Sequence, residues 1–146
     1  MENVNPISMV IATLIPVITG FIFYNKSLFG NHWTDAFGIS KDAMKKAGPM
    51  FVIGVGIVLS ALLAFFMLNF CNGAGQEGEF DSFKHGAAHG AILSIFVVFP
   101  IIGINGLFEQ GAMLNLKLRM LMFINVAYWV VTLSLMGGIL DAMNHF

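Results

Sequence analysis

Long apolar stretches alternate with short polar stretches along the chain, and this pattern predicts four membrane-spanning helices. An α-helix rises about 1.5 Å per residue, so roughly 20 apolar residues cross the ~30 Å hydrocarbon core of a bilayer. Four stretches are long enough, and none has a charged residue in its central part: 7–24, 49–71, 86–106 and 120–140. Lipid cannot satisfy an open sheet edge. We therefore expect an all-α integral membrane protein, a single transmembrane domain (1–146) folded as an antiparallel four-helix bundle.

The composition agrees with this prediction. Of 146 residues, 58% are hydrophobic and 10% are charged, whereas soluble domains carry about 25% charged residues. The net charge of −1 and the lack of a basic stripe give no indication of nucleic-acid binding. Cys71 is the single cysteine, so no intramolecular disulfide can form, and we interpret it as a small buried apolar residue. The lipid bilayer is the first partner that we expect.

The distribution of basic residues predicts the orientation. The third connection has Lys117 and Arg119, the second has a single Lys84 beside three acidic residues, and the two terminal tails have no Lys or Arg. Four further lysines lie in the first connection: Lys26, Lys41, Lys45 and Lys46. Positive charge concentrates on the cytoplasmic side of membrane proteins. We therefore expect the first and third connections in the cytoplasm of a protein of the cytoplasmic (inner) membrane, with both termini outside.

The first connection is long enough to contain a short surface helix. In ISKDAMKKAGP, Ser40 can cap a helix that has Asp42 in its first turn and Lys45 and Lys46 in its last. Such a helix would lie at the membrane interface, where lysines meet anionic headgroups. A plain basic loop is the alternative.

Three stretches resemble a known family: FIFYNKSLFGNHW (21–33), NGLFEQGAMLNLKL (105–118) and INVAYWVVTLSLMGGIL (124–140). With the four-span layout, they resemble small bacterial membrane proteins catalogued as domain of unknown function 1761. The resemblance implies a fold and a topology but no settled activity. The positions that carry it are Tyr24, Phe29, Gly30, Trp33, Phe108, Glu109, Asn125, Tyr128 and Trp129.

Polar residues cluster at the predicted cytoplasmic ends of three helices, because antiparallel neighbours place these ends at one depth. The members are Tyr24, Asn105, Glu109, Asn125 and Tyr128. An amide inside the membrane needs a protein partner, so one interpretation is interhelical hydrogen bonding, with Asn105 paired to Asn125. The alternative is a polar vestibule in which Glu109 attracts a cation or passes a proton.

Histidines mark the opposite ends of the third and fourth helices. His85 and His89 are four residues apart in FKHGAAHGA, and Asp141 and His145 have the same spacing near the C-terminus. Each pair lies on one helix face, and three imidazoles with a carboxylate suit zinc or another divalent transition metal. The alternative is that the histidines only flank a contact between closely packed helices.

Small residues indicate where helices pack. Gly86 and Gly90 form a GxxxG pattern, and Ser134 and Gly138 give the fourth helix a similar face. Pro100 removes a backbone hydrogen bond and should kink the third helix, with a packed kink as the simplest outcome.

The sequence leaves three functional hypotheses open. The first is a non-enzymatic accessory or assembly component, as a homo-oligomer or in a larger membrane complex, without a cofactor. The second is an oligomeric channel or carrier for a small cation or proton that uses the polar cluster. The third is a metal-binding membrane protein with its site at the outer ends of helices three and four.

Overall fold

The computed structural model describes residues 4–38, 46, 48–71, 82–108 and 115–144, and within these residues the chain is helical, with no strand. Four helical segments are long and apolar enough to cross a membrane, as predicted. They are α1 (Pro6–Phe23), α4 (Pro49–Cys71), the continuous run of α5 (Phe83–Leu93), η1 (Ser94–Val98) and α6 (Phe99–Phe108), and α7 (Leu116–Met143). The chain is thus an all-helical membrane bundle.

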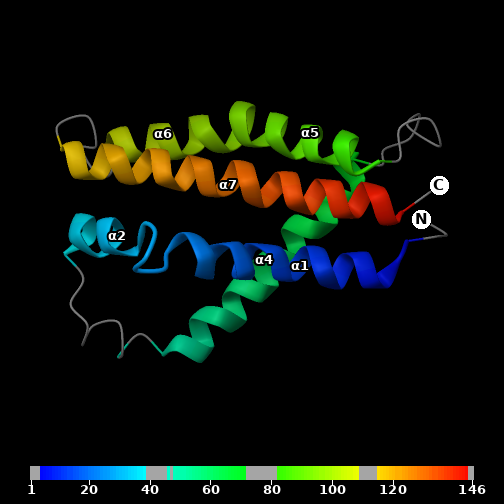
Figure 1. Ribbon diagram of the computed structural model, residues 1–146, viewed down its shortest axis with the longest axis horizontal. Helices are drawn as coiled ribbons and strands as arrows, with labels where there is room; N and C mark the ends of the chain where they lie inside the picture. The colour runs from blue at the N-terminus through cyan, green and yellow to red at the C-terminus, as the bar shows by residue number, and fades with distance from the viewer. Residues whose placement is uncertain (1–3, 39–45, 47, 72–81, 109–114, 145–146) are drawn as a thin grey trace.

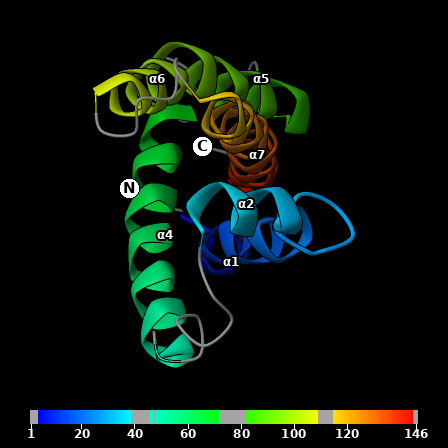
Figure 2. The same cartoon turned by 90° about the vertical axis from the view of Figure 1, so that its left-hand side faces the viewer.

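Successive spans run in opposite directions, and α7 lies between α1 on one side and α5–α6 on the other (Figures 1 and 2). The start of α1, the start of α5 and the end of α7 meet at one end of the bundle, which we call the termini end. The basic residues Lys26, Lys117 and Arg119 belong to the opposite end, which we call the loop end.

Capping side chains determine where three of the helices begin. Asn5 caps α1, because its side-chain oxygen accepts from the backbone N–H of Ile7 at 3.0 Å. Ser82 and Asn115 cap α5 and α7 in the same way. Such a cap satisfies an amide that the helix leaves unpaired. The third span therefore starts at Phe83, earlier than the predicted residue 86, and the fourth starts at Leu116, earlier than 120.

The third span widens before Pro100. The backbone N–H of Phe99 donates to the carbonyl of Ser94, one residue further back than in an α-helix, so residues 94–98 form a π-helical turn. Proline has no N–H to donate, and a wider turn is one way for a helix to accommodate this. Pro100 itself is exposed. Pro100 is therefore not among the buried residues of the helix contacts, in contrast to the packed kink that we expected.

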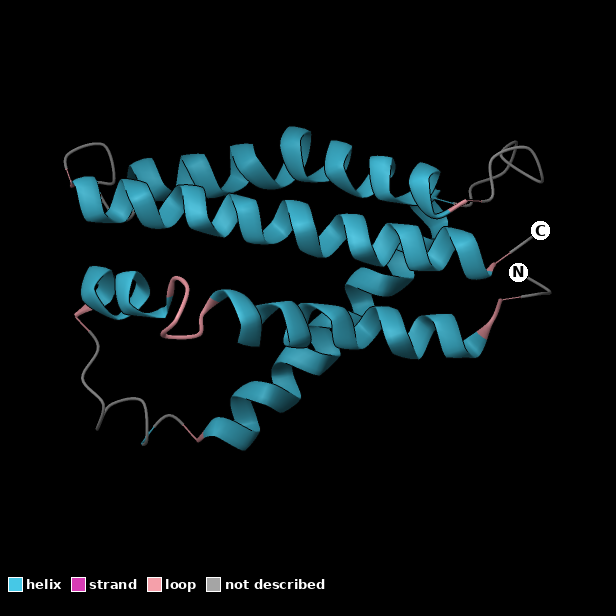
Figure 3. Cartoon of the chain, viewed as in Figure 1, coloured by secondary structure: helices cyan, strands magenta, loops and turns pink. Residues whose placement is uncertain are grey.

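A short helix follows α1 at the loop end. α2 (Gly30–Phe37) lies beside the beginning of α7 and ends at Gly38, which has a left-handed backbone with φ of 61° (Figures 1 and 3). A side chain at Gly30 would overlap the carbonyl oxygen of Tyr24, so the tight turn between α1 and α2 requires glycine. The surface helix predicted after Ser40 lies, except for Lys46, outside the described residues.

The closest helix contact joins α5 to α7 through glycines. A methyl group on Gly86 would overlap the carbonyl oxygen of Gly137, and one on Gly90 would overlap that of Leu133. Gly138 gives room to the ring of Phe83, which lies 2.7 Å from the position of an added Cβ. The GxxxG pattern thus mediates packing inside the protomer. We call the contact that Gly86 and Gly90 make with α7 the glycine contact.

The buried residues of α4 all lie in its second half. Its second half packs against α1, where Ala12 and Ala64 are both fully buried. Its first half diverges from the other helices (Figures 1 and 2). In the most apolar stretch of each span, 22% of α4 is buried, against 44% of α7 and 11% of the α5–α6 run. The bundle therefore has a fixed core of α1, α5 and α7 and one splayed helix.

Candidate functional site

The predicted polar cluster is a hydrogen-bonded contact between α1 and α7. The Tyr24 hydroxyl donates to the side-chain oxygen of Asn125 at 2.6 Å, and the rings of Tyr24 and Tyr128 lie 5.5 Å apart. Asn105 is exposed on α6, so its predicted pairing with Asn125 is wrong. The side-chain oxygen of Asn125 accepts from Tyr24 of the α1 end instead. Glu109 lies outside the described residues.

Further hydrogen bonds connect α1 to α7 between this point and the termini end. Tyr128 donates from its hydroxyl to the carbonyl of Pro16 at 2.9 Å. The hydroxyls of Thr19 and Thr132 lie 2.8 Å apart. At the termini end, Asn144 donates to the hydroxyl of Ser8 at 2.8 Å and accepts from the backbone N–H of Asn5 at 2.7 Å. We call this series the polar ladder: Asn5, Ser8, Pro16, Thr19, Tyr24, Asn125, Tyr128, Thr132 and Asn144.

The polar ladder explains why α1 and α7 stay together. Lipid is as apolar as most side chains, so helix association in a membrane depends on packing and on hydrogen bonds. The sequence revealed only the Tyr24 end of the ladder, because single Ser and Thr residues in apolar helices commonly bond their own backbone. Thr19 also makes such a bond, to Ile15 at 2.8 Å.

Burial, reinforced by the neighbouring Tyr128, raises the pKa of Tyr24 to about 12 from its usual 10.0. Tyr24 directly follows α1 and binds its proton more tightly in the folded protein than in the unfolded chain. Its contribution to stability is therefore present below pH 10 and is lost as the pH rises towards 12. We expect unfolding free energy in detergent to fall over this range, and to fall less steeply in Tyr24→Phe. Identical pH profiles for the two proteins would contradict this assignment.

The histidines and Asp141 meet at the termini end. Nδ1 of His85 lies 2.9 Å from Oδ2 of Asp141, whose side chain is only 1% exposed, and the backbone N–H of Ser82 approaches the same oxygen at 3.4 Å. The ring of His89 lies 4.3 Å from that of His85. Nδ1 of His89 is buried and has no hydrogen-bond partner in the described part of the chain. The structure thus brings three of the four predicted metal ligands together.

Their arrangement favours a structural pairing. Asp141 lies against Gly86 at the glycine contact and holds both His85 and the cap of α5. Within the described residues, no group of three or more His, Cys, Asp or Glu side chains could hold a metal ion. His145, the fourth predicted ligand, lies outside the described residues. The carboxylate therefore orients His85, and the geometry of the described residues provides no complete coordination shell.

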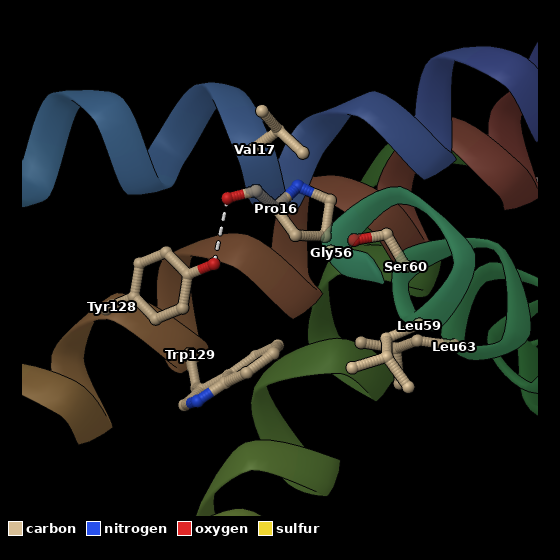
Figure 4. A pocket seen from close by; sticks show the side chains of 8 residues that line it. All are labelled: Pro16, Val17, Gly56, Leu59, Ser60, Leu63, Tyr128 and Trp129. Atoms are coloured by element: carbon tan, nitrogen blue, oxygen red, sulfur yellow. Dashed lines mark hydrogen bonds between the residues drawn. The ribbon is translucent and has the colours of Figure 1, made fainter. Parts of the chain in front are cut away.

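A crevice opens where the first half of α4 leaves the bundle. It has a volume of about 230 Å³ and lies between α1, α4 and α7 (Figure 4). Its lining comprises Pro16, Val17, Gly56, Leu59, Ser60, Leu63, Tyr128 and Trp129. Sequence reasoning missed this feature. The sequence feature that could have revealed the crevice is the presence of a proline, a glycine and a serine near the middle of two spans. Bulky side chains at these positions would fill the space.

Comparison with known proteins identifies the family. A family model described as "Protein of unknown function (DUF1761)" matches residues 7–141, so the chain belongs to this family. No curated protein and no solved structure matches the chain. The resemblance found in the aromatic motifs is therefore correct.

Proposed function

We propose that this DUF1761 protein is a non-enzymatic assembly component of the membrane, and that α4 is the helix through which it joins a second copy of itself. The observation that carries this proposal is the exposed first half of α4. Phe51 is 75% exposed there, and a groove of about 350 Å³ follows the outer side of the helix. Its lining comprises Phe51, Gly54, Val55, Val58 and Leu59, and we call it the α4 groove.

The shape of the α4 groove suits another helix of the same kind. A Cβ placed on Gly54 would meet no heavy atom within 4 Å, so the backbone there is open to a neighbour. Small residues at such a position let two membrane helices approach closely. A two-fold axis along the membrane normal would bring the same face of both copies together, so that Phe51 of each copy enters the groove of the other. We therefore expect this surface to be complementary to itself.

The polar residues of the interior support an assembly role over a cation pathway. Side chains that would line such a path bond across α1 and α7, as Tyr24 does with Asn125 and Thr19 with Thr132. A hydrogen-bonded pair offers few free groups to a passing ion, and the channel hypothesis also relied on Asn105, which is exposed. The bundle therefore resembles a rigid support for the splayed α4.

Disulfide cross-linking tests the assembly. In a Cys71→Ala background, Val55→Cys places one thiol in the α4 groove, and we expect oxidation in native membranes to yield a covalent dimer. Adding Gly54→Leu should reduce the dimer at least fivefold, because the new side chain fills the groove. Its Cβ meets nothing within the protomer, so the fold should persist.

Ile101→Cys on α6 is the matched control, since this residue is also apolar and is 53% exposed. It should remain monomeric under the same oxidation. Equal cross-linking at positions 55 and 101 would indicate random collision, and cross-linking of Val55→Cys only to other proteins would indicate a different partner. Either result contradicts the proposed dimer.

A further inference from the structure

The crevice between α1, α4 and α7 lies deep in the membrane-spanning part of the protein. Pro16, Ser60 and Trp129 each stand near the middle of their helices. A bilayer has no water at that depth, so whatever fills the crevice comes from the lipid phase. The crevice lies on the side of α4 that faces α1 and α7, and it shares only Leu59 with the lining of the α4 groove.

One wall of the crevice presents an unsatisfied hydroxyl. Ser60 is 6% exposed, and the described part of the chain offers its side chain no hydrogen-bond partner. Figure 4 shows this hydroxyl directed towards the side of the crevice formed by Pro16. A hydroxyl that faces the crevice can donate to a molecule held there, whereas lipid tails offer no acceptor. The position of Ser60 therefore indicates a ligand that brings an acceptor oxygen with it.

The other walls are apolar and leave room for a flat group. A Cβ on Gly56 would meet no heavy atom within 4 Å, so the space beside this residue is open. The indole of Trp129 extends along the opposite wall towards Leu59 (Figure 4). Flat aromatic faces pack well against other rings. A volume of about 230 Å³ is about eight times the ~30 Å³ that one water occupies, which is enough for a compact ring.

The depth of the crevice in the membrane limits which molecules can bring an acceptor oxygen to Ser60. Phospholipid ester oxygens lie near the interface, roughly 15 Å from the centre of the bilayer. The acyl tails that reach the centre have no acceptor. A neutral, membrane-dissolved molecule with an oxygen on a compact ring can offer an acceptor to Ser60 at this depth.

We propose that the crevice between α1, α4 and α7 binds the ring of a neutral, membrane-dissolved carbonyl compound of the quinone type. Ser60 donates a hydrogen bond to the ring carbonyl, Trp129 packs against the ring face, and Gly56 provides the space. This proposal concerns binding alone and does not depend on assembly through the α4 groove.

Fluorescence quenching tests the proposal directly. The chain has two tryptophans, so Trp33→Phe leaves Trp129 as the only emitter. The protein is placed in nanodiscs and titrated with 2-decyl-1,4-benzoquinone, with an octyl ester of N-acetyltryptophan in empty nanodiscs as the reference for collisional quenching. We expect saturable quenching of Trp129 above this reference, at about one quinone per protomer.

Three variants in the same background locate the site. Gly56→Leu should abolish the saturable quenching, because its side chain fills the crevice. Ser60→Ala should weaken the apparent affinity about three- to tenfold, as expected for one lost hydrogen bond. Gly54→Leu, a glycine replacement on the other side of the same helix, should leave binding unchanged.

Competition separates a carbonyl site from a general apolar one. Decylbenzene, which has the same tail and no oxygen, should displace the quinone at least tenfold less effectively than 4-decylcyclohexanone, which has the tail and a ring carbonyl but is not a quinone. Equal displacement by decylbenzene would show that an acyl chain suffices and would overturn the proposal. Quenching that never saturates, or that survives in Gly56→Leu, would overturn it as well.

Discussion

Gly90→Ala should be among the most destabilising single-methyl substitutions in this protein. The added Cβ would overlap the carbonyl oxygen of Leu133, which belongs to the backbone of α7 and cannot rotate away. α5 and α7 would have to separate, and the packing around the glycine contact would loosen along its length. Overpacking of this kind costs about 1–3 kcal/mol or more. We expect a loss of at least 2 kcal/mol in unfolding by SDS, followed by circular dichroism.

Gly103→Ala is the matched control for this prediction. It adds the same methyl group to the same span, in the interior of α6, where a Cβ would meet no heavy atom within 4 Å. Alanine is a better helix former than glycine by about 0.5–1 kcal/mol, so this variant should be as stable as the parent or slightly more stable. Equal stability of the Gly90 and Gly103 variants would show that α5 and α7 do not meet at Gly90.

Asp141→Ala should have the second large effect. The carboxylate of Asp141 is almost fully buried, pairs with His85 at 2.9 Å and supports the cap of α5 through Ser82. Removing the acceptor of a buried hydrogen bond costs about 1–3 kcal/mol. We expect a loss of about 3 kcal/mol in the same unfolding assay, and a smaller loss for Asp141→Asn, which retains the shape and an acceptor oxygen.

A double-mutant cycle with His85→Ala isolates the pair from the effect of the cavity. The sum of the two single losses of unfolding free energy should exceed the loss in the double variant by more than about 1 kcal/mol, because either substitution alone already breaks the contact. Additive losses would show that Asp141 acts through packing at Gly86 and not through His85.

Span positions could be predicted from the sequence because they depend on length and composition alone. All four predicted stretches are helical, and the boundary errors have local causes, namely the caps Ser82 and Asn115. Depth could also be predicted: antiparallel neighbours placed Tyr24 level with Asn125, and His85 level with Asp141. Each of these pairs is in hydrogen-bond contact.

The sequence did not predict which helix faces contact each other. Asn105 has the right depth for Asn125 but is exposed on α6, whereas Tyr24 from α1 makes the bond. The GxxxG pattern suited a partner protomer as well as a neighbouring helix, and the structure assigns it to α7 through Gly137. The crevice beside Ser60 depends on the angle at which α4 leaves the bundle, and no local pattern encodes that angle.

The sequence by itself determined that this protein is a four-span helical membrane protein, and it determined the depth of each polar residue. The tertiary structure alone decided which helix faces meet, which polar groups pair, and that α4 diverges to leave the α4 groove and the crevice. The physical reason is that lipid and protein interior are equally apolar, so hydrophobic periodicity carries little information about facing. Which helix faces meet is decided instead by close backbone contacts at glycines such as Gly90 and by hydrogen bonds between residues distant in sequence.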